Sequence, residues 1–143
     1  MSVLRATPDD IPWIAEQIEI FNSTLNTKHS LLPTSLDKEL EALQNDHVLL
    51  VAWYNGDRAG MIGGQFTSHP YNPDVSLLLE RFWWVNSYHR RKGVGASLLR
   101  AFVDAGKDCD IIHLSSLPGR PVPAEVIEEL DFRQAETAYI KEN

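Results

Sequence analysis

The sequence has 143 residues, with 13 Lys and Arg against 20 Asp and Glu, for a formal net charge of -7. This length suits one domain, residues 1–143, with one core. The acidic balance argues against nonspecific nucleic-acid or anionic-membrane binding, and no apolar stretch reaches the ~20 residues that span a bilayer. Its single cysteine, Cys109, can form no intrachain disulfide, and no secretory signal pattern is present. We therefore expect a cytoplasmic protein.

The N-terminal third predicts one short strand and two helices. Residues 3–5 form the strand candidate, and Thr7 is a typical N-cap for a helix over residues 8–21 because Pro8 and two aspartates follow it. Ser35 is expected to cap a second helix, whose apolar face repeats at helical spacing through Leu36, Leu40 and Leu43.

The middle of the chain has the pattern of a sheet. Asn55-Gly56 is a preferred two-residue hairpin turn between the apolar run 48–54 and a second run rich in glycine. Residues 67–76 are expected to form an unpaired loop, since Pro70 and Pro73 disfavour regular pairing. Residues 77–85 then predict a strand buried on both faces.

The remaining third predicts a helix over 96–107, a buried strand over 110–116, a short helix over 124–130, and a terminal strand or hairpin after residue 130. The fold class is therefore α/β: a single domain with about four helices and a mixed, mostly antiparallel sheet. Its one parallel crossover is the strand-helix-strand unit over residues 77–116.

The turn inside that crossover gathers Arg90, Arg91 and Lys92 directly before Gly93-Val94-Gly95. A loop that enters a helix presents backbone N–H groups and the positive end of the helix dipole, so it can bind an anion. The alternative is that the glycines only shape a tight turn and the cations are solvated. The spacing is neither the ATP-binding phosphate loop nor the dinucleotide fingerprint.

This turn resembles the R/Q-x-x-G-x-G/A signature of the GNAT superfamily of N-acetyltransferases, with Arg90, Gly93 and Gly95 at the three signature positions. The order of elements along most of the chain is also similar. Where the family often has Leu-Gly-Phe before its last strands, this chain has Leu130-Asp131-Phe132. The resemblance implies a GNAT-like fold, in which residues 79–85 and 110–115 are parallel but splayed by a bulge.

The resemblance also implies that acetyl-CoA is the cosubstrate. Its pyrophosphate would lie on the backbone amides of residues 91–96 and its pantetheine along residues 82–85. The implied cofactor-binding residues are Trp83, Trp84, Val85, Arg90, Arg91, Lys92, Gly93, Val94, Gly95 and Ala96. Trp83 and Trp84 should point to opposite faces of the sheet, and core packing is the alternative for both.

Transfer of an acetyl group to an amine needs a base, and Glu80 is the candidate because it is the one acidic residue within the predicted strand, residues 77–85. Family members often carry their glutamate one residue later, where this chain has Arg81. A structural role for Glu80, paired with Arg81, is the alternative. A backbone N–H near Trp84 or Val85 would polarise the acetyl carbonyl.

No general acid can be assigned from the resemblance, because Ile127 occupies the position where many members have a tyrosine. Ser115, Ser116 and Tyr139 are alternative donors, and solvent could also protonate a thiolate whose pKa is near ~8.5. His113 is expected to be either half-buried and structural or a proton relay. Cys109, between two aspartates, is not expected to be a nucleophile, and no metal site is expected.

The sequence thus predicts an acetyl-CoA-dependent N-acetyltransferase that transfers the acetyl group directly to a primary amine within a ternary complex. The acceptor loops, residues 22–33 and 67–76, do not identify this amine, although the acidic balance favours a cationic one. A noncatalytic acyl-CoA-binding or protein-interaction module is the alternative. We expect no specific nucleic acid and no membrane as partner, and a homodimer is compatible with the sequence.

Overall fold

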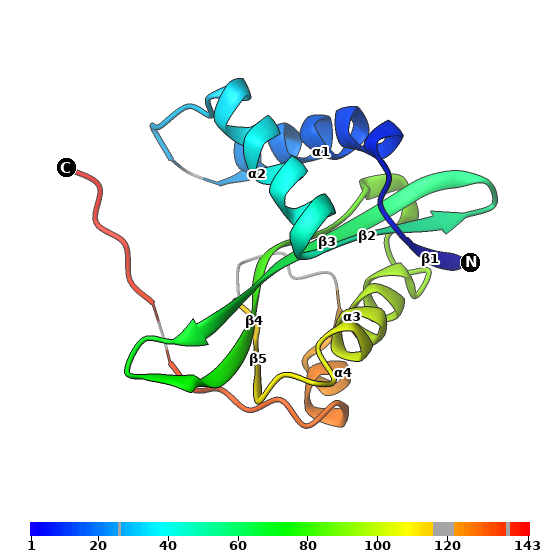
Figure 1. The fold of residues 1–143 in the computed structure, drawn as a ribbon. Coiled ribbons are helices and arrows are strands. Elements are labelled where there is room, and N and C mark those ends of the chain that lie inside the picture. Colours follow the sequence, from blue (N-terminus) through cyan, green and yellow to red (C-terminus); the bar gives the residue numbers. More distant parts are fainter. Residues whose placement is uncertain (26, 116–121, 137) are drawn as a thin grey trace.

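A computed structural model describes residues 1–25, 27–115, 122–136 and 138–143. One twisted sheet separates two helical layers, with α1 and α2 on one face and α3 and α4 on the other (Figure 1). In chain order the elements are β1 (Ser2–Arg5), the 3-10 turn η1 (Pro8–Asp10), α1 (Ile11–Thr24), α2 (Pro33–Asp46), β2 (Val48–Tyr54), β3 (Asp57–His69), β4 (Asn72–Val85), the 3-10 turn η2 (Ser87–His89), α3 (Val94–Ala105), β5 (Ile111–His113) and α4 (Ala124–Glu129).

The sheet has the strand order β1-β2-β3-β4-β5, with antiparallel pairs up to β4 and a parallel β4–β5 pair. This arrangement confirms the expected mixed α/β class with a single parallel crossover. The predicted hairpin turn is also confirmed, since Asn55 (φ 50°) and Gly56 (φ 84°) connect β2 to β3. Asparagine and glycine are the residues that tolerate this left-handed backbone best.

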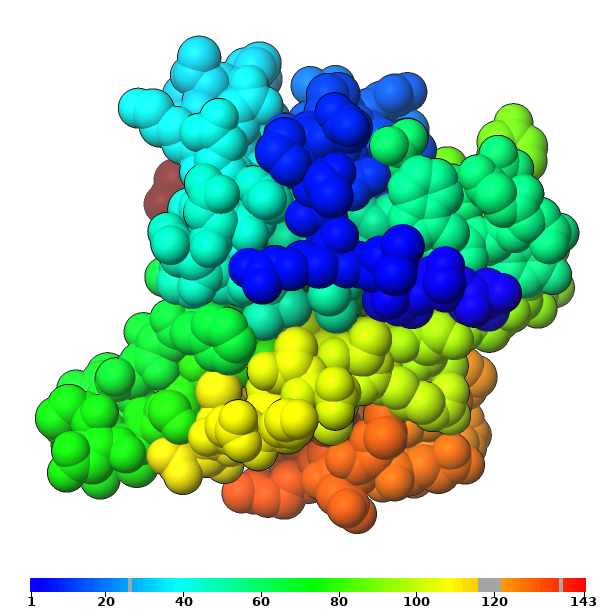
Figure 2. All heavy atoms as spheres, turned by 45° about the vertical axis from the view of Figure 1, so that its right-hand side comes forward, coloured from blue at the N-terminus to red at the C-terminus, as the bar shows by residue number. Residues whose placement is uncertain are grey.

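The expectation that residues 67–76 form an unpaired loop is wrong. Antiparallel pairing between β3 and β4 continues to His69↔Asn72, and the hairpin tip projects from the body of the molecule (green at lower left in Figure 2). Pro73 is accommodated because β5 pairs with β4 only from Leu77, so this part of β4 is an edge strand.

Two further expectations are corrected. Helix α2 begins at Pro33 with Leu32 before it, so Ser35 lies inside the first turn and is not the cap. After α4, the described residues of the C-terminal segment form no strand. This segment contacts the rest of the fold through side chains such as Glu136, whose Oε1 lies 3.0 Å from His113 Nε2. Glu142 Oε2 accepts a hydrogen bond from the Lys28 N–H in the loop after α1.

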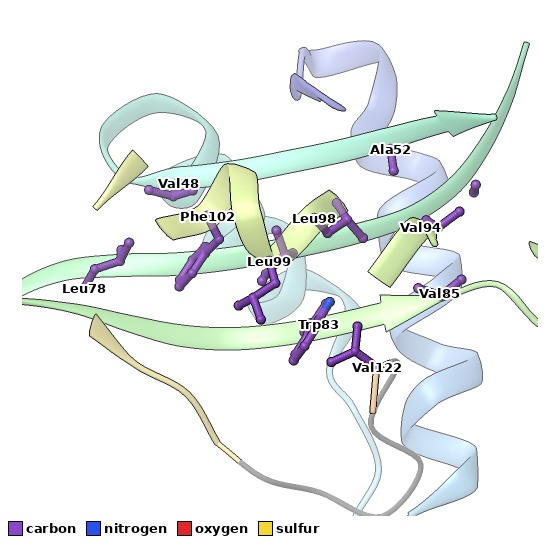
Figure 3. Packing of buried hydrophobic residues seen from close by; sticks show 12 residues of the cluster. Val48, Ala52, Leu78, Trp83, Val85, Val94, Leu98, Leu99, Phe102 and Val122 are labelled. Atoms are coloured by element: carbon purple, nitrogen blue, oxygen red, sulfur yellow. The ribbon is translucent and has the colours of Figure 1, made fainter. Parts of the chain in front are cut away.

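The core has two parts, one on each face of the sheet. The α3-side core contains Trp83, Val85 and the apolar face of α3 (Figure 3), and the α1/α2-side core contains Phe82, Trp84 and the apolar faces of α1 and α2. Strand β4 therefore contributes large side chains to both, as its continuous apolar sequence predicts. Trp83 and Trp84 do point to opposite faces, and each is only 8% exposed.

The glycines of β3 make room for aromatic rings on both faces. A Cβ on Gly63 would lie 2.6 Å from the Phe82 ring, and one on Gly64 would lie 2.5 Å from the Phe102 ring of α3. Because aromatic rings cannot yield as a flexible side chain does, these positions require glycine. The small residues that weaken β3 as an isolated strand thus allow it to pack closely.

We predict that Gly64→Ala lowers the free energy of unfolding by about 1–3 kcal/mol, as overpacking does in a dense core. Chemical denaturation of both proteins would measure the loss. Phe102→Leu should recover part of it in the double variant by removing the clashing ring. If the losses from the two single variants simply added, the proposed clash would be excluded.

Candidate functional site

Strand β4 has one edge that is paired along most of its length and one that is mostly open. Its pairing with β3 reaches Gly60↔Val85, whereas its parallel pairing with β5 is confined to residues 77–79. Within the described residues, no strand pairs with residues 80–85 on the β5 side. We call the β5-facing side of residues 80–85 the open edge of β4. The separation of β4 from β5 here is the one that the resemblance implied.

The open edge presents specific backbone groups. The Asn86 N–H donates to Ala59 O of β3 at 2.9 Å. Because the N–H groups of an extended strand alternate between its two edges, the Trp84 N–H also faces β3, while those of Trp83 and Val85 face the open edge. Of the two amides considered from the sequence, the Val85 N–H is therefore the one oriented to polarise a bound carbonyl.

A β-bulge in β4 separates the neighbouring charged residues Glu80 and Arg81. Gly63 pairs with Phe82 and Gly64 with Glu80, so Arg81 is the extra residue. Its guanidinium turns towards α2, where Nε and Nη2 each lie 2.7 Å from Oε1 of Glu39. Glu80, on the other side of the strand, accepts a hydrogen bond from the backbone N–H of Ser115, just beyond β5. The glutamate is thus at the divergence of β4 and β5.

The environment of Glu80 raises the pKa of its carboxyl from 4.5 to about 7. Burial is the main cause, because it disfavours the charged form, and it outweighs the Ser115 hydrogen bond and the charge of Arg81, which both lower the pKa. A carboxyl with this pKa exchanges protons readily at neutral pH, which suits a general base.

The turn after β4 presents further backbone amides at the start of α3. Arg91 (φ 62°) and Gly93 (φ 79°) both adopt left-handed conformations, and the Ser97 N–H donates to Gly93 O at 3.1 Å. The N–H groups of residues 94–96 precede this helical hydrogen bond, so they have no partner within α3. Together with the helix dipole, they form an anion-binding N-terminus.

The three cations of the turn have different surroundings. The Arg90 guanidinium lies 4.7 Å above the centre of the Trp84 ring, and its Nε donates to Val85 O at 3.2 Å. The Lys92 ammonium lies 5.2 Å from the centre of the Tyr54 ring. Arg91 is exposed. Two of the three cations therefore rest on aromatic faces at the turn.

The structure also connects residues that the sequence did not single out. Gln17 of α1 is 4% exposed, and its Oε1 accepts hydrogen bonds from Trp84 Nε1 at 3.1 Å and Asn86 Nδ2 at 3.2 Å. The sequence did contain a sign of this role, because Gln17 is a polar residue within the apolar face that Ile14 and Phe21 define. Asn86 begins the turn and accepts a hydrogen bond from the Tyr88 N–H.

The other candidates lie apart from this arrangement or make other contacts. His113 is half-buried, and its Nε2 lies 3.0 Å from Glu136 Oε1. Tyr139 is 91% exposed in the C-terminal segment, and Ile127 packs against the α3-side core. Ser115 uses its backbone N–H on Glu80. Ser116 lies outside the described residues.

Burial is the main cause that raises the pKa of the Cys109 thiol, with Asp108 and Asp110 adding to it, which disfavours a nucleophilic thiolate. The described residues contain no group of three or more His, Cys, Asp or Glu side chains able to hold a metal ion. Nor does any helix among them have the length and apolar character needed to cross a membrane.

Two surface hollows lie away from the open edge of β4. One, of about 480 Å³, is bordered by α3, β5 and the end of α4, and the other, of about 590 Å³, lies between η1, α1 and α2. Neither includes Glu80 or the basic turn. The backbone amides, the raised carboxyl pKa and the cations therefore make the open edge of β4 and its turn the candidate site.

A model of the acetyltransferase (GNAT) family matches residues 14–121, a range that includes β4, the basic turn and α3. No protein with a curated description matches the chain in sequence.

Solved structures with a similar fold include a transcriptional regulator from Bacillus halodurans C-125, with 19% identity, a TM-score of 0.76 and 99% of each chain covered. A probable acetyltransferase has 18% identity and a TM-score of 0.75, with 100% of both chains covered. A predicted acetyltransferase with acetyl-CoA from Clostridium acetobutylicum has 16% identity and a TM-score of 0.72, over 99% of this chain and 95% of that one. At such identities these similarities show a shared fold.

The raised pKa of Glu80 predicts how stability depends on pH. Between pH 4.5 and about 7 the unfolded chain loses the Glu80 proton while the folded protein still holds it, so this group's contribution to stability falls as pH rises through that window. Glu80→Gln cannot titrate. Relative to this variant, the wild type should lose up to about 3 kcal/mol of unfolding free energy between pH 4.5 and pH 8.

Urea denaturation of both proteins at several pH values would measure this difference. The exposed Glu16 of α1 offers a matched control, and Glu16→Gln should give a nearly constant difference from the wild type. A constant difference for Glu80→Gln as well would show that Glu80 is not in the buried environment described.

Proposed function

Because this chain belongs to the acetyltransferase (GNAT) family, we propose that it transfers the acetyl group of acetyl-CoA to a primary amine, directly and within a ternary complex. The observation that carries the proposal is that three features lie along β4 and the turn that follows it. These are the open edge of β4, the amides at the start of α3, and Glu80 between β4 and β5.

The backbone of the site fits the shape and chemistry of acetyl-CoA. Backbone N–H and C=O groups of the open edge can hydrogen-bond the two amides of pantetheine as an added strand would. The N–H groups of residues 91–96 suit a pyrophosphate, and Arg90 and Lys92 add positive charge beside them. Acetyl-CoA supplies an activated acetyl carbonyl, and the Val85 N–H is oriented to polarise it.

Glu80 is proposed as the base. An amine is a nucleophile only after it has lost the proton of its ammonium form, and a carboxylate can accept this proton directly or through water. With a pKa of about 7, Glu80 is ionised in a substantial fraction of molecules at neutral pH and still basic enough to be effective. No side chain is assigned as the general acid, since Ile127 is apolar and solvent can protonate a thiolate.

A thiol-release assay with acetyl-CoA and a panel of amines and peptides tests the proposed function. At least one amine should stimulate release, and kcat/KM should rise with pH through about 7 as Glu80 ionises. Glu80→Gln should lower kcat by roughly a hundredfold or more with little change in acetyl-CoA affinity. Binding without turnover for every amine would support a noncatalytic acyl-CoA-binding module instead.

Gly93 and Gly56 provide a matched pair that tests the phosphate-binding turn. Both have a left-handed backbone, with φ values of 79° and 84°, and a Cβ added to either would meet no atom within 4 Å. Gly93→Ala and Gly56→Ala should therefore lose similar stability, about 1 kcal/mol each, from backbone strain. Only Gly93→Ala should weaken acetyl-CoA binding, because only Gly93 lies within the proposed pyrophosphate site, residues 91–96.

Isothermal titration calorimetry with acetyl-CoA would measure the affinities, and thermal denaturation the stabilities. Equal affinities for the two variants would mean that Gly93 only shapes the turn.

A further inference from the structure

Gln17 joins α1 to the end of β4 and to the start of the basic turn. Its side chain is buried within the α1/α2-side core, where a carboxamide oxygen needs hydrogen-bond donors. Two donors from another part of the chain, Trp84 Nε1 and Asn86 Nδ2, converge on this one oxygen at 3.1 and 3.2 Å. The sequence separations of 67 and 69 residues show that only the folded chain creates this contact.

Trp84, the first of these donors, also contacts Arg90. The Trp84 indole is fixed by Gln17 at its N–H and by the Phe21 ring, whose centre is 5.2 Å away. Arg90 lies over this indole, and its Nε is bonded to Val85 O. These two restraints hold the guanidinium flat, while its terminal nitrogens make no hydrogen bond or ion pair within the described residues. They are thus free to bind an oxygen anion with little loss of conformational entropy.

Asn86, the second donor, also hydrogen-bonds the backbone of the turn. The Asn86 side chain donates through Nδ2 to Gln17 and accepts through Oδ1 from the Tyr88 N–H at 3.1 Å. Its backbone donates to Ala59 O and accepts from the His89 N–H, each at 2.9 Å. Because both ends of the carboxamide are used, its orientation is fixed. Gln17 therefore restrains the point at which the chain leaves β4 and enters η2.

We propose that Gln17 is a positioning residue for the anion-binding turn, acting through Trp84 on Arg90 and through Asn86 on the turn backbone. Replacing it with an apolar residue would leave a buried donor, Trp84 Nε1, and a partly buried one, Asn86 Nδ2, without their acceptor. The indole and the Asn86 carboxamide would then rotate to find other partners, and Arg90 would lose the surface on which it lies. This inference rests on the proposed binding of acetyl-CoA at the turn.

Gln17→Met tests the inference because methionine has a similar length and no strong acceptor. Two measurements are needed: the dissociation constant of CoA by calorimetry, and the NMR signal of the Arg90 Nε–H in the ligand-free protein. We expect CoA to bind about tenfold more weakly, as for the loss of one charge-assisted hydrogen bond. The Arg90 signal should also broaden or exchange faster, because the guanidinium is no longer held in place.

Two variants separate positioning from general stability. Gln17→Glu keeps an acceptor oxygen and should restore most of the affinity and the Arg90 signal. Ile14→Val removes a buried methyl group from the same helix and should lower stability while leaving both measurements unchanged. If Gln17→Met does not fold, Trp84→Phe removes the Nε1–H together with the five-membered part of the indole ring and retains an aromatic face, with an expected loss of about threefold in affinity.

The outcomes distinguish this inference from the proposed function. If the wild type binds CoA and Gln17→Met binds it equally well with an unchanged Arg90 signal, Gln17 has no positioning role. An unchanged affinity in Trp84→Phe would overturn the inference in the same way. If the wild type does not bind CoA, the proposed function fails, while the Arg90 signal still decides whether Gln17 holds the guanidinium.

Discussion

The site depends on the pairing of β4 with its two neighbouring strands, because β4 stays paired with β3 but separates from β5. Its hydrogen bonds to β3 extend to Val85, whereas β5 leaves it after residue 79. The bulge at Arg81 falls just after that point, and a bulge bends a strand and increases its twist. The strand is thus anchored on one edge, while on its other edge no strand among the described residues pairs with residues 80–85.

The same bulge distributes charge across the sheet. Arg81 turns towards α2 and pairs with Glu39, which leaves Glu80 in a partly buried position with a backbone N–H as its partner. Direct pairing of Glu80 with Arg81 would hold the carboxylate ionised and its pKa low. Because Arg81 has another partner, burial dominates instead, and one strand can supply both a carboxyl group of raised pKa and a backbone amide that faces the same edge.

The basic turn is held by contacts from both sides of the sheet. Tyr54 of β2 lies beneath Lys92, and Trp84 of β4 lies beneath Arg90, whose orientation depends in turn on Gln17 of α1. The cations on this acidic chain are therefore partly fixed before any ligand arrives. Fixing them in advance reduces the entropy lost when an anion binds. A helix from the opposite layer of the fold thus takes part in arranging the turn.

Most of the fold could be predicted from the sequence, because its local patterns agree with the final structure. Asn55-Gly56 specified the hairpin, and the continuous apolar run before Val85 specified a strand buried on both faces. Pro70 and Pro73 led to the wrong prediction of an unpaired loop. A proline is excluded from a central strand, but it is tolerated where β4 becomes an edge strand. The expected terminal strand did not form in the described residues. A segment becomes a strand only where a neighbouring strand offers an edge to hydrogen-bond, and its own sequence does not reveal this.

The sequence by itself indicated the family and predicted the order of the elements up to α4, because hydrophobic patterns and the spacing of arginine and glycine along a strand-turn-helix unit are local information. The sequence identified Glu80 as the candidate base, but it could not show which side of the strand this residue faces. Only the tertiary structure decided that Glu80 faces β5 and Arg81 faces α2, that Val85 presents its amide to the open edge, and that Gln17 supports the turn. These properties depend on the bulge register and on contacts between residues far apart in the chain, which no local pattern encodes.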